Sequence, residues 1–162
     1  KKKKISIIMK KFHDNDQLKI VSDLPIKKYS KKKIYIKNKG NFFNNHWTYF
    51  PPTSCIAMKR SIFQKVLKST SIGSYPDIWL DFRIGIFSKY IFKQYFIINN
   101  NLTYYRQTST NISSNFSHLS KNWWKRRMQA HSFVKYFFLR NKIIYKHNLD
   151  YYFTKTLNYF IK

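Results

Sequence analysis

Hydrophobic residues recur along the chain with two alternating periods, and this alternation predicts an α/β fold. Near the start, Ile5, Ile8, Met9 and Phe12 recur at helical spacing with lysines between them, which predicts a surface helix that ends near Asp14. Short β-prone runs predict strands further on, and the helical period returns between and after them. The predicted strands are residues 18–22, 33–37, 54–58, 93–98 and 102–106, and the later predicted helices are residues 60–68, 77–90 and the stretch from 119 to 161.

Breaks in this pattern predict the connections between the elements. Pro25 and a lysine cluster follow the first strand and predict a loop, and the run 41–52, which ends in two prolines, predicts a surface loop. The run Asn99–Asn101 is a tight-turn sequence, so the strands around it are expected to form a hairpin or to lie side by side. The last helical stretch is expected to present one continuous face, formed by Trp123, Ala130, Phe133, Val134 and Phe137 and then by Tyr152, Thr156, Tyr159 and Phe160.

The segment 77–90 has the most informative pattern, because apolar residues occupy nearly every side of the predicted helix. Such a helix is expected to be buried almost all round. The remaining positions, Asp77, Asp81, Gly85 and Ser88, are spaced by four, four and three residues and therefore share one edge of the helix. Two carboxylates are expected on one face.

A chain of 162 residues with 43% hydrophobic and 20% aromatic residues is long enough and apolar enough for a packed core. Residues 1–118 are expected to form an α/β domain, and residues 119–162 are expected to form amphipathic, aromatic-rich helices. The single cysteine, Cys55, excludes an internal disulfide and a cysteine-based zinc site and favours a reducing cytoplasm. No apolar run is long enough to span a bilayer, and the lysine-rich start is too soon interrupted for a signal peptide.

The charge balance is strongly basic. There are 32 Lys and Arg residues against six acidic residues, which gives a formal net charge of +26. Such an excess is typical of proteins that bind nucleic acids or anionic membranes. However, abundant Lys, Ile, Asn, Phe and Tyr with scarce Gly and Pro is also the residue set of an AT-rich genome, and the excess of Lys over Arg weighs against a dedicated nucleic-acid partner. A basic nucleic-acid-binding module, with phosphate contacts from Lys1–Lys4, Lys31–Lys33 and Lys125–Arg127, remains an alternative.

Two short segments carry candidate chemistry. The sequence YPDIWL at residues 75–80 places the carboxylate of Asp77 at the predicted start of a buried helix. There it is either a structural N-cap or a functional group that the helix dipole keeps ionised at neutral pH. The sequence LTYYRQTSTNIS at residues 102–113 is typical of a strand that ends in Tyr105 and Arg106 and is followed by a polar loop. A structural ion pair is one explanation of this arginine.

A third segment, Asp14-Asn15-Asp16, has the D-x-D form with which some transferases hold a divalent cation against a sugar-nucleotide diphosphate. Hard oxygen ligands suit Mg²⁺ or Mn²⁺. The competing explanation is a solvated helix end, where Asp and Asn are common.

In their order and spacing, the first two segments resemble family 2 glycosyltransferases. The C-terminal halves of that family carry an Asp-x-Trp-Leu helix start, a strand and then Tyr-Arg-Gln-x-x-x-Asn, which here ends at Asn111. The resemblance extends back to Pro52–Arg60 and to Ile20–Asp23, and it covers residues 18–115. It implies a partial GT-A, Rossmann-like fold with a mixed sheet, flanking helices and a helical C-terminal extension.

The resemblance implies the acceptor-side half of an inverting transferase. Such an enzyme moves a sugar from a nucleotide-sugar donor to a hydroxyl of a glycan or lipid-linked acceptor, commonly in cell-envelope polysaccharide or glycolipid synthesis. Asp77 takes the position of the catalytic general base, and Asp81 is either an orienting carboxylate or a structural ion-pair partner. The residues expected at the acceptor are Trp79, Tyr105, Arg106, Thr53 and Ser54.

The complete enzyme is expected to need Mg²⁺ or Mn²⁺, held mainly by an N-terminal, nucleotide-binding half expected to precede Lys1. Within this chain Asp14, Asp16 and His118 are the candidate ligands, and solvated side chains are the competing explanation. The chain alone is therefore expected to be inactive, and a docking fragment of a split enzyme is a further alternative. Its basic helices are expected to lie against an anionic membrane, at the cytoplasmic face.

Overall fold

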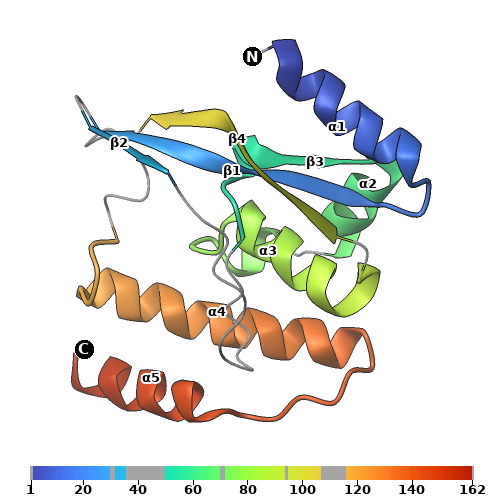
Figure 1. The fold of residues 1–162 in the computed structure, drawn as a ribbon. Coiled ribbons are helices and arrows are strands. Elements are labelled where there is room, and N and C mark those ends of the chain that lie inside the picture. Colours follow the sequence, from blue (N-terminus) through green and yellow to red (C-terminus); the bar gives the residue numbers. More distant parts are fainter. Residues whose placement is uncertain are drawn as a thin grey trace. The chain divides into compact units, whose positions relative to one another are not determined.

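The computed structural model describes residues 2–29, 32–35, 50–69, 72–93, 95–106 and 116–161. It is a mixed α/β structure, as the hydrophobic pattern predicts, and it divides into two compact units (Figure 1). The first unit comprises Lys1–Ser69 and Leu80–Thr108, and the second comprises Thr70–Trp79 and Ser109–Lys162.

A mixed sheet forms the centre of the first unit, and β1 (Ile20–Tyr29) is its middle strand. Along one edge of β1 runs β4 (Tyr95–Arg106) in the parallel direction. Along the other edge, β2 (Lys32–Tyr35) pairs antiparallel with one end of β1 and β3 (Ile56–Met58) with the opposite end. The sheet is therefore three strands wide although it contains four strands (Figure 1).

The predicted loop at Pro25 is wrong, because β1 continues through this proline. Proline lacks the N–H that a central strand normally donates, so it is tolerated only where the ladder is interrupted. The ladder to β4 is interrupted at this point, since its register passes from Asp23 opposite Ile98 directly to Pro25 opposite Thr103.

The predicted hairpin around Asn99–Asn101 is also wrong, because β4 runs without a break from Tyr95 to Arg106. The asparagines form a bulge instead of a turn. The side-chain amide of Asn101 donates to the carbonyl oxygens of Leu24 (3.2 Å) and Pro25 (3.3 Å) and so replaces the missing ladder bonds. A polar side chain that supplies these bonds lets the strand keep its direction.

Helix α1 (Lys2–Asp14) is confirmed, but it is anchored to the sheet by a buried ion pair. Lys4 Nζ lies 2.8 Å from Oδ1 of Asp23, whose side chain is fully buried. The Asp23 carboxylate also accepts the backbone N–H of Leu102 at 3.2 Å and the hydroxyl of Thr103 at 3.1 Å. The lysine additionally donates to the carbonyl oxygen of Ser54 at 2.9 Å. These bonds join α1, β1, β4 and the loop before β3.

Apolar packing adds to this anchor. Ile8 of α1 is buried in one cluster with Leu18, Val21 and Ile98. Ile5 and Met9 of the same helix are 69% and 60% exposed. The prediction of a surface helix is therefore correct only for the face of α1 that carries Ile5 and Met9.

Cys55 ends the short helical turn η1 (Thr53–Cys55) and is completely buried beside the ion pair. Burial raises the pKa of its thiol, and the negative charge of Asp23 raises it further. Only the thiolate reacts readily with disulfide reagents. We therefore expect native protein to react with a thiol reagent at pH 8 about a hundredfold more slowly than urea-unfolded protein, since reaction requires an opening of the structure. Equal rates in the two states would contradict this placement.

The helices of the first unit follow their predicted positions closely. Helix α2 (Arg60–Ser69) buries Ile62 and Val66 as expected. Helix α3 (Leu80–Phe87) continues into the π-helical turn η3 (Ser88–Phe92). Its burial almost all round is confirmed by the buried run Arg83, Ile84, Gly85, Ile86 and Phe87.

The second unit contains two long helices, α4 (Lys121–Arg140) and α5 (Leu149–Phe160), which pack against each other (Figure 1). Ser120 caps α4 by accepting the N–H of Trp123, and Asn148 caps α5 by accepting that of Tyr151. The predicted inner face of α4 is confirmed for Ala130, Phe133, Val134 and Phe137, which are buried, whereas Trp123 is only half-buried and Trp124 is buried instead. Its predicted continuation in α5 is wrong, because Tyr152, Thr156, Tyr159 and Phe160 are exposed. No helix in the described ranges is both long and apolar enough to cross a membrane.

Candidate functional site

Asp77 lies in a β-turn that precedes α3, not in the helix itself. The turn is closed by the N–H of Ile78, which donates to the carbonyl oxygen of Tyr75 at 3.1 Å. Pro76 occupies the second position of this turn, where its fixed φ is favourable. Because α3 begins only at Leu80, the predicted stripe of carboxylates and the predicted effect of the helix dipole on Asp77 are wrong.

Gln129 of α4 holds the Asp77 carboxylate in place. Its Nε2 donates to Oδ2 of Asp77 at 2.6 Å, and its Oε1 accepts the backbone N–H of Asp77 at 3.3 Å. The two bonds close a ring that fixes both the position and the orientation of the half-buried carboxylate. Within the part of the chain that the structure describes, no hydrogen bond engages its other oxygen, Oδ1.

An aromatic and cationic cluster lies beside this pair. The guanidinium of Arg126 is 4.0 Å from the centre of the Trp79 ring and 4.6 Å from that of Phe116. Such cation–π contacts stabilise a positive charge against the faces of the rings. Arg126 and Gln129 are three residues apart on α4 and so project from the same side of the helix. The positive charge therefore lies one helical turn from the amide that holds Asp77.

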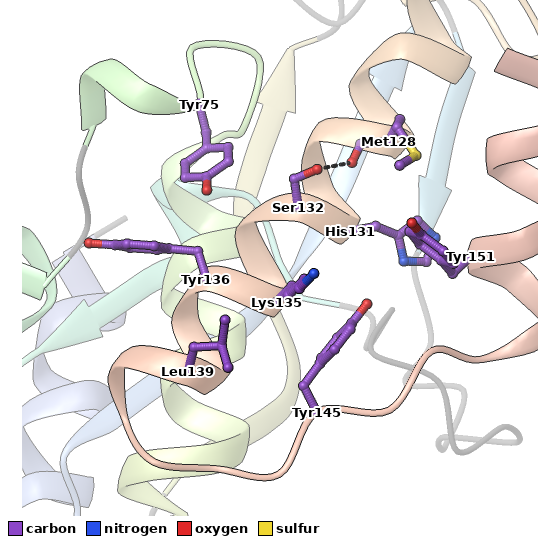
Figure 2. Close-up of a pocket in the computed structure, with 9 residues that line it drawn as sticks. All are labelled: Tyr75, Met128, His131, Ser132, Lys135, Tyr136, Leu139, Tyr145 and Tyr151. Carbon is purple, nitrogen blue, oxygen red and sulfur yellow. Dashed lines mark hydrogen bonds between the residues drawn. The ribbon is translucent and has the colours of Figure 1, made fainter. Parts of the chain in front are cut away.

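Tyr75 connects the turn to a pocket of about 350 Å³ in the second unit (Figure 2). Figure 2 shows Tyr75 and Tyr136 at one side of the pocket and His131, Tyr145 and Tyr151 at the other. The Tyr75 ring packs on Phe133 and Tyr136 at 5.7 and 5.9 Å. The lining is completed by Met128, Ser132, Lys135 and Leu139. A few polar groups on a mostly aromatic wall are typical of small-molecule sites.

Charged and phenolic groups give the pocket its electrostatics. His131 is buried, and its Nε2 lies 3.0 Å from Oδ2 of Asp150, whose other oxygen pairs with Arg127. Burial raises the pKa of the Tyr145 hydroxyl, and the neighbouring phenols Tyr151 and Tyr152 raise it further. The Tyr145 hydroxyl therefore stays protonated at neutral pH and can donate a hydrogen bond to a ligand.

The other residues expected at the acceptor belong to the first unit. Thr53 and Ser54 are exposed on η1, Tyr105 is half-buried on β4, and Arg106 is the last residue of that strand. Asp81 is half-buried in the first turn of α3, where its Oδ1 accepts the N–H of Phe82 at 2.7 Å. The structure thus brings Trp79 and Asp77 together in one turn. Gln107 and Asn111 lie outside the described residues.

The candidate metal ligands do not form a cluster. Asp14 is the last residue of α1 and lies 3.8 Å from Nδ1 of His13, and Asp16 follows it in an exposed turn. His118 belongs to the second unit and packs its ring on Trp123 at 5.0 Å. Among the residues the structure describes, no group of three His, Cys, Asp or Glu side chains is placed to hold a metal ion.

The residues that surround Asp77 could be found only partly from the sequence. Tyr75 belongs to the motif itself. Gln129 is 52 residues away, and a polar residue in the middle of a helix gives no signal of its partner. Arg126 is part of a basic run that is typical of a solvated surface.

Comparison of the chain with protein-family models, with curated proteins and with solved structures finds no match in any of the three.

Proposed function

We propose that this chain forms the acceptor side of an inverting glycosyltransferase of family 2, with Asp77 as the general base. The observation that carries the proposal is the Asp77 carboxylate, which Gln129 holds by one oxygen and which follows, two residues along the chain, Tyr75 of the tyrosine-lined pocket. The order of YPDIWL and LTYYRQ along the chain supports the same assignment.

The proposed chemistry uses the carboxylate oxygen Oδ1. An acceptor hydroxyl donates its hydrogen bond to Oδ1 of Asp77 and attacks the anomeric carbon of the donor sugar. Its proton passes to Asp77, and the bond to the nucleoside diphosphate breaks on the opposite face with its electron pair, which inverts the anomeric centre. Mg²⁺ or Mn²⁺, when bound in the complete enzyme, stabilises the diphosphate leaving group.

Position matters more than basicity in this scheme. A carboxylate held at the reacting hydroxyl makes proton removal effectively intramolecular. Gln129 serves this purpose because its two hydrogen bonds restrict the rotation of the Asp77 side chain. It touches no reacting atom and is therefore a positioning residue.

The pocket matches an acceptor sugar in size and chemistry. Its volume of about 350 Å³ lies within the range of small-molecule sites. The rings of Tyr75 and Tyr136 offer apolar faces to a hexose, while the hydroxyl of Tyr145 and the ammonium of Lys135 offer hydrogen-bond donors. The proposed acceptor is a glycan or a lipid-linked sugar, the class that the resemblance implies.

The proposal that this chain binds the acceptor while a separate part binds the donor is tested by comparing two protein preparations. In the family that the chain resembles, the nucleotide is bound by residues that precede the segments found here. We therefore expect the 162-residue chain alone to transfer no sugar, whereas the same chain joined to its upstream nucleotide-binding half transfers sugar from a radiolabelled UDP-sugar or GDP-sugar. Transfer by the isolated chain would contradict this separation of acceptor and donor binding, and absence of transfer by the joined protein with every donor would contradict the proposed function.

A further inference from the structure

Helix α5 buries a polar side chain completely and leaves most of its large apolar side chains exposed. The side chain of Thr154 is completely buried, and Asp150 is half-buried on the same side. On a neighbouring side of the helix, Leu149, Phe153 and Phe160 are 88%, 60% and 76% exposed, and the Phe153 ring lies 5.8 Å from that of Trp124 on α4. A helix packed for stability alone places its apolar stripe inward.

Polar contacts explain what holds the helix in this orientation. Asp150 forms an ion pair with Arg127 of α4, its Oδ2 lies 3.0 Å from Nε2 of His131, and the Tyr151 ring packs edge-on against His131 at 5.5 Å. A half-turned α5 would expose these pairs and break them. These contacts therefore fix the rotation of α5 and keep its large apolar side chains exposed.

Exposed apolar residues also precede α5, and the region around them is basic. Ile144, in the connection before α5, is 82% exposed, and Tyr152 and Tyr159 flank the stripe at 56% and 71%. We call the residues Ile144, Leu149, Phe153 and Phe160 the apolar stripe. Between 116 and 161, Asp150 is the one acidic residue of the sequence, and its charge is already paired. The exposed cations in the same region are Lys121, Lys125, Lys135, Arg140, Lys142, Lys146 and Lys155.

We propose that α5 lies in the headgroup region of an anionic lipid bilayer, with the apolar stripe inserted and the surrounding lysines on lipid phosphates. An exposed aromatic and aliphatic face flanked by cations is what such interfacial helices present. Tyrosines at the margin of the stripe suit the membrane–water boundary. The proposal is independent of the sugar-transfer function.

Charge and side-chain type favour lipid over the other occupants of such a surface. A second copy of the chain carries the same formal net charge of +26, and repulsion between the two copies opposes association. Single-stranded nucleic acid stacks on aromatic rings but gains little from the aliphatic side chains of Ile144 and Leu149.

The test measures partition of the whole chain onto vesicles by sedimentation. Wild-type protein is expected to bind phosphatidylcholine vesicles containing phosphatidylglycerol about tenfold more strongly than phosphatidylcholine alone. The charge-neutral double variant Leu149→Ser/Phe160→Ser is expected to lose about tenfold or more of the binding to the anionic vesicles, because two apolar side chains no longer insert. Both positions are highly exposed, so far-UV circular dichroism is expected to be unchanged.

Tyr104→Ser is the matched control, because this residue is 49% exposed on β4 of the first unit. It is expected to bind vesicles like the wild type. Ile144→Ser lies outside any helix and provides a second test that does not depend on the folding of α5. Unchanged binding by both stripe variants would overturn the proposal in favour of adsorption by charge alone. Binding to poly(U) without binding to vesicles would also overturn the proposal. So would a wild-type dimer that dissociates in the stripe variants.

Discussion

Replacing Asp77 by Asn in the complete enzyme is expected to lower kcat for sugar transfer by about 10²–10⁴-fold, the usual contribution of a positioned general base. Asparagine has the same shape, so its amide oxygen still accepts the hydrogen bond from Gln129 that fixes Asp77 in the structure. What the variant loses is the ability to take the proton of the acceptor hydroxyl. In the proposed function the donor is bound by a nucleotide-binding part outside this chain, so KM for the nucleotide sugar is expected to be nearly unchanged.

Gln129→Leu separates positioning from proton transfer. Leucine removes both hydrogen bonds that Gln129 makes to Asp77 but leaves the carboxylate present. We expect a smaller loss of kcat, about 10-fold to 100-fold, since a misplaced base retains its chemistry. Initial rates with saturating donor, measured beside circular dichroism spectra of each variant, check both expectations. Wild-type turnover by Asp77→Asn would remove this residue from the base role.

The helices could be predicted from the sequence because their cause is local. The period of apolar residues locates α1, α2 and the start of α4 within a few residues, although it does not separate α4 from α5, and the nearly uniform apolar composition of α3 correctly predicts its burial. The error at α3 concerns its start, because Pro76 favours a β-turn as much as the first turn of a helix. That choice decides whether Asp77 belongs to a helix.

The sheet was harder to predict because its errors arise from contacts between distant segments. A run of asparagines favours a turn locally, but Asn101 bonds to the carbonyl oxygens of Leu24 and Pro25, 77 and 76 residues away. The same holds at the candidate site, where Asp77 meets Gln129 from a helix later in the chain. Periodicity also fails for α5, because ion pairs rather than apolar burial set the rotation of that helix.

The buried ion pair of the first unit yields the largest expected effect on stability. Lys4→Met leaves the fully buried Asp23 without its cation, and we expect a loss of about 3–5 kcal/mol in the free energy of unfolding. Nearly all of this loss of stability comes from the buried, unpaired charge of Asp23. Little of it comes from the lost attraction between Lys4 and Asp23. Urea unfolding followed by circular dichroism measures it.

The double variant Lys4→Met/Asp23→Asn distinguishes these two causes. Asparagine removes the stranded charge, its amide oxygen can accept the N–H of Leu102, and its amide NH2 can donate to the hydroxyl oxygen of Thr103, the two groups that bond to Asp23 in the structure. We therefore expect the double variant to be more stable than Lys4→Met alone, because a neutral pair costs less to bury than one unpaired charge. Lys3→Met is the matched control, since Lys3 is exposed on the same helix, and its effect is expected to stay within about 0.5 kcal/mol. If Lys4→Met cost no more than this control, the pair would be a surface contact, and α1 would be held to the sheet by the Ile8 cluster alone.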